Sequence, residues 1–354
     1  MKLSYNLLPQ SFQNMRPVAL ASERAGLYSI AIADSPLISR ELFVSCAECL
    51  HETKSLNVMT AVTNPLTRHP SVAASAIATL CEMAPGRLLV GIATGDSAAW
   101  GVGLRPAKVS VLSDYIIALK QLLRGEVATW QGHEFRLHWD GYDPSSAPPI
   151  YVACAGPRVL RMAVEVADGI IPAMGYAPQN IAHVKQLVAD ACVEFERDIH
   201  EFAISWYAEF TFGESAEEVL KSHLGADSQW LVMGSTEGKL IPPEYIPLLK
   251  EMHADGHNLA VAYKDRERGE KLVQRAKSLG LYDWLYARAS RLCGTPAEIG
   301  ARLQSFQEQG LDHWCLWQDG GEGDYNDMPV KLGEALRFVD CSPSALVGQN
   351  GLIV

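Results

Sequence analysis

The sequence predicts an α/β protein with a (β/α)8 or TIM-barrel fold, in which eight parallel strands alternate with helices. Short apolar runs alternate with helical patterns along most of the chain, which is typical of repeated βαβ units. The runs are almost continuously apolar, as expected for strands that are buried on both faces. The first run ends in Leu8-Pro9-Gln10, whereas a doubly wound dinucleotide-binding sheet would carry glycines there. The barrel is therefore favoured over the open sheet.

In the first half of the chain, glycines and a proline mark the ends of the expected elements. Helical patterns stop at Gly26, Gly86 and Gly125, and Pro70 precedes another, because glycine suits a helix end and proline a helix start. The expected strands are 2–8, 28–33, 56–62 and 87–93, and the expected helices are 13–25, 41–53, 71–83 and 109–124.

In the second half, the pattern resumes after a short polar hairpin at 128–139. The expected strands are 149–153, 169–173, 202–212 and 313–317, and the expected helices are 157–166, 178–196, 295–309 and 329–338. Residues from about 214 to 290 are expected to form a helical, loop-rich insertion late in the barrel, broken at Ile241-Pro242-Pro243. The chain is thus predicted to be a single domain, 1–354, that ends in a loop-like tail.

Composition excludes several classes of function. The formal net charge is -11 and no basic run occurs, so a nucleic-acid partner is disfavoured. No apolar stretch is long enough to span a membrane, and the N-terminus lacks the features of a signal peptide. The eight cysteines include Cys46-Ala-Glu-Cys49, but this pair lies in a helical apolar pattern and no second pair follows at zinc-site spacing. Reduced, packed thiols and a cytoplasmic location are expected.

The active site of a barrel lies where the strands end. Cys154-Ala155-Gly156-Pro157-Arg158 passes directly from a strand into a helix. The amides of the helix start and Arg158 would hold a phosphate well, but an ordinary turn would need the same glycine and proline. Both interpretations stay open on composition alone.

Other strand ends carry polar residues with two interpretations each. Asp96, after Gly95, and Asp34 are either site carboxylates or helix caps. Asn64 precedes a proline, so its backbone is expected to be extended. Arg68 is a candidate partner for a carboxylate or a phosphate, whereas His69 is expected to be structural. The remaining strand ends are Leu8-Pro9, Met174-Gly175 and 318–321.

Other enzyme classes leave no signature in the chain. The sequence contains no P-loop, no GxSxG nucleophile motif and no HExxH zinc motif, and its ten histidines show no tight metal-ligand spacing. No metal site is therefore expected. Eight tryptophans are compatible with the walls of a flat-ring pocket or with core packing.

Three ordered segments resemble the luciferase-like superfamily, and in particular the methylenetetrahydromethanopterin reductases and their flavin-dependent relatives. These segments are Val62-Thr-Asn-Pro-Leu-Thr-Arg-His-Pro70, Pro85-Gly-Arg87 through Gly95-Asp96, and Tyr151-Val-Ala-Cys-Ala-Gly-Pro-Arg158 through Asp168-Gly169. The resemblance is strong to about residue 190, weakens in the insertion, and returns around 294–299 and 310–316.

The resemblance implies a barrel that holds FMN or the deazaflavin F420 at its mouth. It implies a phosphate cradle at Gly156, Pro157 and Arg158, an acidic residue near the ring at Asp96, and a non-proline cis peptide near Ala61-Val62. With the strand-end residues, the candidate catalytic residues are Asp96, Asp34 and Asn64, and the candidate cofactor-binding residues are Ala61, Val62, Thr63, Gly95, Asp96, Ala153, Ala155, Gly156, Pro157, Arg158, Met174 and Gly175.

One departure concerns the second strand. Deazaflavin-dependent alcohol and sugar-phosphate dehydrogenases of the superfamily end that strand in Asp-His, but this chain has Asp34-Ser35. Serine does not titrate near neutral pH, so the histidine mechanism does not carry over.

The first hypothesis is therefore a flavin-dependent monooxygenase that uses reduced FMN and O2 to oxygenate a small organic substrate. A separate NAD(P)H:flavin reductase would supply the reduced FMN, since no NAD-binding domain is evident. The alternatives are an F420-dependent reductase or dehydrogenase and a non-enzymatic flavin-binding relative. Because many relatives pair through barrel helices, a homodimer or homotetramer is expected.

Overall fold

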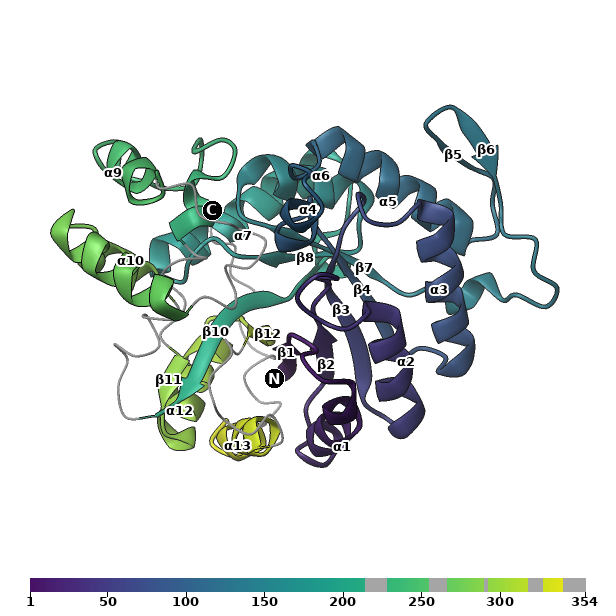
Figure 1. The fold of residues 1–354 in the computed structure, drawn as a ribbon, viewed down its shortest axis with the longest axis horizontal. Coiled ribbons are helices and arrows are strands. Elements are labelled where there is room, and N and C mark those ends of the chain that lie inside the picture. The colour runs from purple at the N-terminus through teal and green to yellow at the C-terminus, as the bar shows by residue number, and fades with distance from the viewer. Residues whose placement is uncertain (214–227, 255–265, 290–291, 318–326, 340–354) are drawn as a thin grey trace.

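A computed structural model describes residues 1–213, 228–254, 266–289, 292–317 and 327–339 (Figure 1). Its main sheet contains β1 (Lys2–Leu7), β2 (Ser29–Ile32), β3 (Asn57–Thr63), β4 (Leu88–Ile92), β7 (Ile150–Cys154), β8 (Gly169–Pro172), β9 (Ala203–Ile204), β10 (Trp206–Phe212), β11 (Leu292–Gly294) and β12 (His313–Trp317). The strands follow the order β11-β10-β12-β1-β2-β3-β4-β7-β8-β9, and every pair is parallel. The predicted α/β class with a parallel sheet is confirmed.

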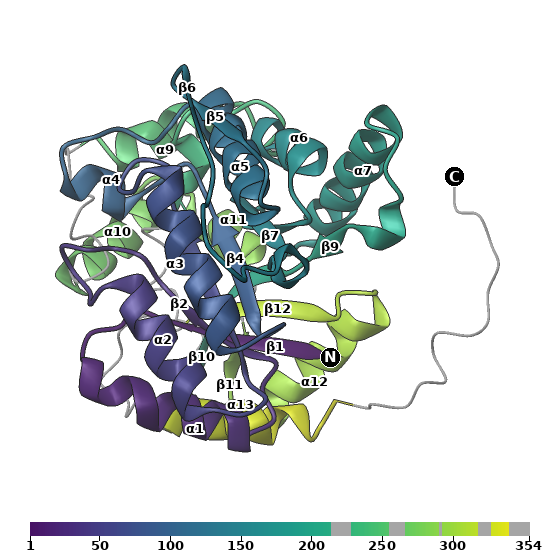
Figure 2. The same ribbon diagram turned by 90° about the vertical axis from the view of Figure 1, so that its right-hand side faces the viewer.

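Helices surround the curled sheet on its outer face (Figures 1 and 2). They are α1 (Met15–Arg24), α2 (Leu42–Glu52), α3 (Pro70–Met83), α5 (Val109–Leu123), α6 (Pro157–Val166), α7 (Pro178–Glu194), α12 (Pro296–Glu308) and α13 (Asp327–Leu336), with 3-10 turns at Phe12–Asn14, Pro144–Ser146 and Ile199–Glu201. The short helix α4 (Ser97–Gly101) instead follows the end of β4. The predicted hairpin is present as β5 (Ala128–Trp130) and β6 (His133–Phe135), which pair antiparallel. Both cysteines of the CxxC pair are buried within α2, as predicted.

The two faces of the sheet form separate hydrophobic clusters, because alternate side chains of a strand point to opposite faces. Along β12, Trp314 and Leu316 pack in the large cluster that includes the helices, whereas Cys315 packs in a smaller interior cluster. The interior also holds polar groups near the start of the strands, where Ser4 bonds to His313. Burial, and then the charge of Lys2, lower the pKa of His313 to about 4, so the imidazole is neutral near pH 7.

The seventh predicted strand, 202–212, differs from the prediction. The structure divides it at Ser205 into β9, which pairs with β8, and β10, which pairs with β12. The N–H of Ser205 donates to the carbonyl oxygen of Ile170 at 2.8 Å. The chain therefore changes partner within one apolar run, and apolar periodicity carries no signal of such a change. The short helix α4 and strand β11 were also not predicted.

A bulge in β3 shapes the interior beside β4. The register between the two strands shifts between Thr60 and Thr63, and the predicted non-proline cis peptide is present at Ala61-Val62. Thr60 Oγ1 donates to the carbonyl oxygen of Gly91 at 2.8 Å and accepts from its N–H at 2.9 Å. These two bonds hold the bulge against β4, so Ala61 and Val62 enter the interior of the sheet.

The described part of the predicted insertion is helical. Residues 228–232 are helical and are followed by α9 (Tyr245–Met252), α10 (Arg266–Ser278) and α11 (Tyr282–Arg288). Buried apolar residues of this region form a cluster of their own, separate from the sheet's two clusters. No helix in the described ranges combines the length and the apolar character needed to cross a bilayer. The strand-end segment 318–321, Cys341 and the C-terminal tail lie outside the described residues.

Candidate active site

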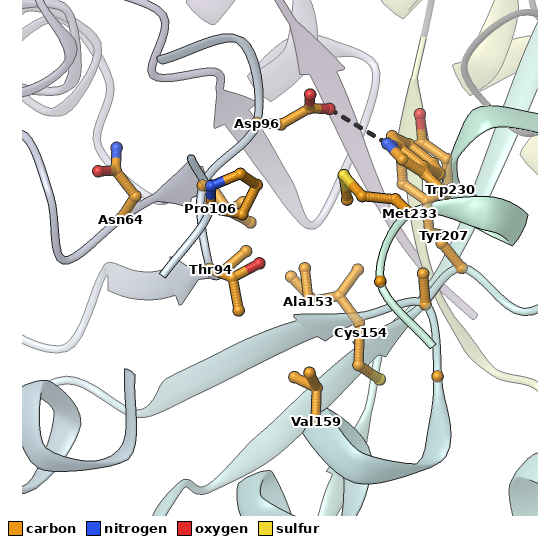
Figure 3. A pocket seen from close by; sticks show the side chains of 18 of the residues that line it. Asn64, Thr94, Asp96, Pro106, Ala153, Cys154, Val159, Tyr207, Trp230 and Met233 are labelled. Atoms are coloured by element: carbon orange, nitrogen blue, oxygen red, sulfur yellow. Dashed lines mark hydrogen bonds between the residues drawn. The ribbon is translucent and has the colours of Figure 1, made fainter. Parts of the chain in front are cut away.

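A cavity of about 710 Å³ opens where the parallel strands end (Figure 3). Its walls include Leu8 after β1, Ser35 after β2, Thr94 after β4, Gly156 after β7 and Ala173 after β8. Ligand pockets for cofactors and small molecules usually have volumes of about 300–1,000 Å³. The cavity is therefore large enough for a tricyclic ring, and it lies where a barrel fold places its active site.

Most of the predicted site residues line this cavity. They are Asp34, Ala61, Val62, Asn64, Gly95, Asp96, Ala153, Ala155, Gly156, Pro157 and Arg158. Thr63, Met174 and Gly175 do not line it. Thr63 lies behind the wall, where its hydroxyl donates to Asp34 Oδ2 at 2.8 Å.

Met174 and Gly175 contact Arg288 of the insertion. The carbonyl oxygen of Met174 accepts from Asn180 Nδ2 at 3.0 Å and from Arg288 Nη2 at 2.7 Å. A Cβ on Gly175 would lie 2.7 Å from Cγ of Arg288. The close approach that this glycine permits is therefore to an arginine of α11, so the geometry gives these two residues a packing role rather than a position at the cavity.

Asp34 belongs to a buried ion pair. Its side chain is 1% exposed and accepts from Arg68 Nη1 at 2.6 Å and from Arg68 Nη2 at 3.2 Å. Arg68 also bonds to Glu41 at 2.7 Å. The prediction that Arg68 pairs with a carboxylate is thus confirmed. Because both Nη donors of Arg68 and the Thr63 hydroxyl engage the Asp34 carboxylate, we assign it to holding the rim together.

Asn64 shapes the loop after β3. Its Oδ1 accepts from the N–H groups of Leu66 at 2.9 Å and Thr67 at 3.1 Å, which is the hydrogen bonding of an Asx turn. His69 Nδ1 accepts from the N–H of Ser71 and caps α3, the structural role predicted for it.

Asp96 bonds to a residue of the insertion. It stands at the N-cap position of α4, but its side chain does not cap that helix. Instead its Oδ2 accepts from the indole N–H of Trp230 at 3.1 Å, across 134 positions of sequence (Figure 3). Of the two predicted roles, the geometry favours a side chain at the cavity wall over a helix cap.

The turn at Gly156 begins α6 as predicted, with Pro157 at the first helical position. No side chain of the described residues caps this helix, so the amides of Arg158 and Val159 face its open end. The guanidinium of Arg158 is largely exposed and bonds to Glu237 at 3.1 Å. Open amides and a mobile cation suit a phosphate, although an anion there would have to displace Glu237.

Lys239 lies against the same turn. A Cβ on Gly156 would be 3.1 Å from Cε of Lys239, so the glycine makes room for this side chain. The ammonium donates to the carbonyl oxygens of Trp230, Leu231 and Met233 at 2.7, 3.3 and 3.0 Å. Burial, and then Arg288, lower the pKa of Lys239 to about 8. With its three donors engaged, Lys239 fixes the segment that carries Trp230 and is not available to bind a phosphate.

The sequence left the eight tryptophans open between pocket walls and core packing, and the structure places three of them, together with a tyrosine that was not predicted, at the cavity. Trp100, Tyr207, Trp230 and Trp317 all line it, and the rings of Tyr207 and Trp230 meet edge to face at 5.7 Å between centroids. Trp317 ends a predicted strand, and that position was the available signal. Trp230 lies in the insertion, and no local pattern in the sequence connects it to Asp96.

The thiols at the cavity wall are unsuited to nucleophilic chemistry. Burial raises the pKa values of Cys154 and Cys315 to about 12, so both thiols are protonated near neutral pH. Within the described ranges, no three His, Cys, Asp or Glu side chains gather as a metal site. The charges and hydroxyls that remain at the cavity can bind and orient a molecule.

Comparison with known sequences gives one family. The profile of the luciferase-like monooxygenases matches residues 2–313. The 5,10-methylenetetrahydromethanopterin reductase of Methanolobus tindarius is 26% identical over 299 residues, which are 83% of this chain and 86% of that relative. The F420-dependent glucose-6-phosphate dehydrogenase of Nakamurella multipartita is 35% identical over 136 residues, which are 36% of this chain and 40% of that enzyme.

Solved structures share the fold at low sequence identity. An F420-dependent secondary alcohol dehydrogenase aligns with a TM-score of 0.69 and 17% identity, over 96% of this chain and 99% of that one. A monooxygenase from Streptomyces bottropensis aligns with a TM-score of 0.65 and 17% identity, over 95% and 99%. At these identities the likeness concerns the fold alone.

Proposed function

The chain belongs to the luciferase-like monooxygenase family, and on that basis we propose that it is an F420-dependent oxidoreductase that transfers hydride between F420 and a small organic substrate. The observation that carries the proposal is the cavity at the strand ends, where the open start of α6, the β3 bulge and Asp96 meet. Named relatives of the chain are oxidoreductases, which supports an enzymatic role.

The residues present fit a flat ring with a phosphorylated tail. Small side chains at Ala61, Ala153 and Ala155 leave room for a ring beside the β3 bulge. The uncapped amides at the start of α6 and the nearby guanidinium of Arg158 suit the phosphate. The cavity combines aromatic and apolar walls with polar side chains that can orient a ligand, as cofactor sites do.

The chain's own residues would bind and orient the substrate and would exclude water from the cavity. When bound, reduced F420 supplies a hydride to an electron-poor carbon of the substrate. Trp230, held by Asp96 and by the segment that Lys239 fixes, covers the cavity from the insertion side. Exclusion of water strengthens the field of the Asp96 carboxylate at the reacting atoms.

FMN-dependent oxygenation is the second candidate. Several sequence relatives are named as F420-dependent dehydrogenases, which favours F420 and reverses the order of the two hypotheses drawn from the sequence. Membership of the luciferase-like monooxygenase family supports oxygenation as the second activity. That activity would require O2 and a separate NAD(P)H:flavin reductase.

We also infer that the curled sheet closes as a complete eight-stranded barrel. β9 pairs with β8, β10 pairs with β12, and only Ser205 stands between β9 and β10. Continuity of the chain through Ser205 would therefore join the two ends of the sheet, with β11 added outside on β10.

The cofactor assignment is tested by titrating the protein with F420, FMN and riboflavin and following fluorescence. F420 is expected to bind more tightly than FMN. Arg158→Ala should weaken binding of both phosphorylated cofactors by about 5-fold and leave riboflavin binding unchanged, because one exposed charged contact contributes about 1 kcal/mol.

Arg161→Ala is the matched control, because Arg161 is an exposed arginine of the same helix that pairs with Glu194 away from the cavity. Tighter binding of FMN, with O2 uptake that depends on a reductase, would support the second candidate. Binding of no cofactor would reject both. Equal losses for riboflavin and the phosphorylated cofactors would remove the phosphate role of Arg158.

Asp96→Asn is expected to reduce turnover by about 100-fold while thermal stability stays unchanged. Asparagine keeps an oxygen for the Trp230 indole but removes the charge, and a positioned acid–base group contributes on that order. The measurement is oxidation of the reduced cofactor against a panel of small ketones, aldehydes, imines and enones. A large drop in melting temperature with normal turnover of the remaining folded protein would give Asp96 a structural role instead.

A further inference from the structure

Two buried serine hydroxyls meet in the cavity wall. Ser35 follows β2 and Ser97 begins α4, and their Oγ atoms lie 2.5 Å apart. Each residue is 7% exposed, and both line the cavity. The two residues are 62 positions apart, so the pair joins two separate strand-end loops at the site.

The pair has one hydroxyl proton more than the hydrogen bond between the two serines uses. Two hydroxyls carry two O–H donors, and the bond between them uses one. Among the described residues, neither hydroxyl has a second hydrogen-bond partner. The backbone carbonyl of Ser35 is already engaged by Ile38 and Ser39, and the adjacent Asp34 carboxylate by Arg68 and Thr63. One O–H therefore remains without an acceptor in the described protein.

A buried donor without an acceptor loses more free energy than a buried lone pair left empty. Because both residues line the cavity, a molecule bound there can supply the missing acceptor. Either oxygen can carry the spare proton, because the proton between the two can belong to either. The pair thus behaves as one donor with two alternative positions.

We propose that the Ser35–Ser97 hydroxyl pair is a donor site that binds a carbonyl-type oxygen of a molecule in the cavity. The proposal deepens the proposed function, on which it rests, by naming the acceptor group. A donor at this position would stabilise negative charge that develops on such an oxygen when hydride reaches the adjacent carbon. The same chemistry could serve a substrate oxygen or a ring carbonyl of the cofactor, and the experiment separates these two.

The test uses carbonyl-13C-labelled cyclohexanone and methylenecyclohexane, which have similar shapes and differ in the acceptor oxygen. Affinities and the infrared C=O band are measured for the protein, Ser35→Ala, Ser97→Ala and the double variant. Each single variant keeps one hydroxyl, whose proton is then free, so cyclohexanone should bind within about 3-fold of the parent protein. The double variant should lose about 10-fold in cyclohexanone affinity and none for methylenecyclohexane.

The infrared band gives an independent readout. In the parent protein and both single variants, the bound C=O band should lie at lower wavenumber than in an apolar solvent, and in the double variant this shift should vanish. Ser22→Ala is the control, because Ser22 is a buried serine of α1 whose hydroxyl bonds to Val18 away from the cavity. It should leave affinity and band unchanged.

A purely structural pair would behave differently. Each single variant would then lose the whole stabilising bond in thermal unfolding, the double variant would lose no more, and carbonyl binding would be indifferent to all three. That pattern overturns the proposal, as does failure of the parent protein to bind cyclohexanone or to shift its band.

The same samples are measured with and without F420. A band shift that persists with F420 bound assigns the donor to a substrate oxygen, and a shift that F420 abolishes assigns it to the cofactor's own carbonyl. Failure of F420 to bind, with the carbonyl shift intact, would reject the proposed cofactor but keep the donor site. If F420 binds but the band does not depend on the two serines, the donor site is rejected and the proposed cofactor is kept.

Discussion

Arg68→Met is expected to lower the free energy of unfolding by about 3–5 kcal/mol, because removing one partner leaves the other charge buried without compensation. The Asp34 side chain is 1% exposed and the Arg68 side chain 13%, so water replaces little of the lost contact. Methionine keeps much of the apolar stem and removes the charge. Urea unfolding, followed by circular dichroism, measures the loss.

Arg161→Met is the control for this prediction. Its pair with Glu194 is about half exposed on both sides, so its removal is expected to change stability by at most about 1 kcal/mol. Adding Asp34→Asn to Arg68→Met should restore part of the stability, since the stranded charge is then gone. Equal effects at Arg68 and Arg161 would contradict the view that the Asp34 pair fixes the rim of the cavity.

Gly91→Ala is expected to destabilise the protein by about 3 kcal/mol or more and to abolish cofactor binding. A Cβ on Gly91 would lie 2.3 Å from the carbonyl oxygen of Thr60 and 3.0 Å from Cγ1 of Val62. The first contact is with backbone, which cannot turn aside as a side chain can. Relief requires β3 and β4 to separate, which breaks the two bonds between Thr60 and Gly91 and displaces the bulge that enters the cavity.

Gly213→Ala serves as the comparison, because a Cβ there meets no atom of the described residues within 4 Å and its φ lies outside the left-handed region. It should unfold like the parent protein and bind cofactor normally. The readouts are the melting temperature and the fluorescence titration with F420. Normal cofactor affinity in Gly91→Ala would show that the bulge does not form the ring site.

Local signals in the sequence predicted most of the elements and part of the site. The apolar runs, and the Gly and Pro residues at their ends, predicted the bounds of the first four strands and their helices to within a few residues. These features act through the backbone of their own segment. Pro157 begins α6 as predicted. The resemblance supplied the cis peptide at Ala61-Val62, which no periodicity announces.

The remaining features of the site depend on contacts between segments that are far apart in the sequence. The geometry shows that Gly156 accommodates Lys239, 83 positions away along the numbering, whereas the sequence suggested that it admits a ligand. The bond from Trp230 to Asp96 and the arginine against Gly175 also come from the insertion. Such pairings are fixed by how the insertion docks, and one sequence carries no local pattern for them.

The helical insertion has its own apolar cluster, yet it contributes Trp230 and Met233 to the cavity. The candidate phosphate turn at the start of α6 and the β3 bulge, in contrast, belong to the sheet and the helices around it. Substitutions at 230 or 233 can therefore alter which molecules fit without changing any residue of the turn or the bulge. A relative with a differently shaped cavity could arise by substitutions in that short segment, while the candidate phosphate turn and the bulge are inherited unchanged.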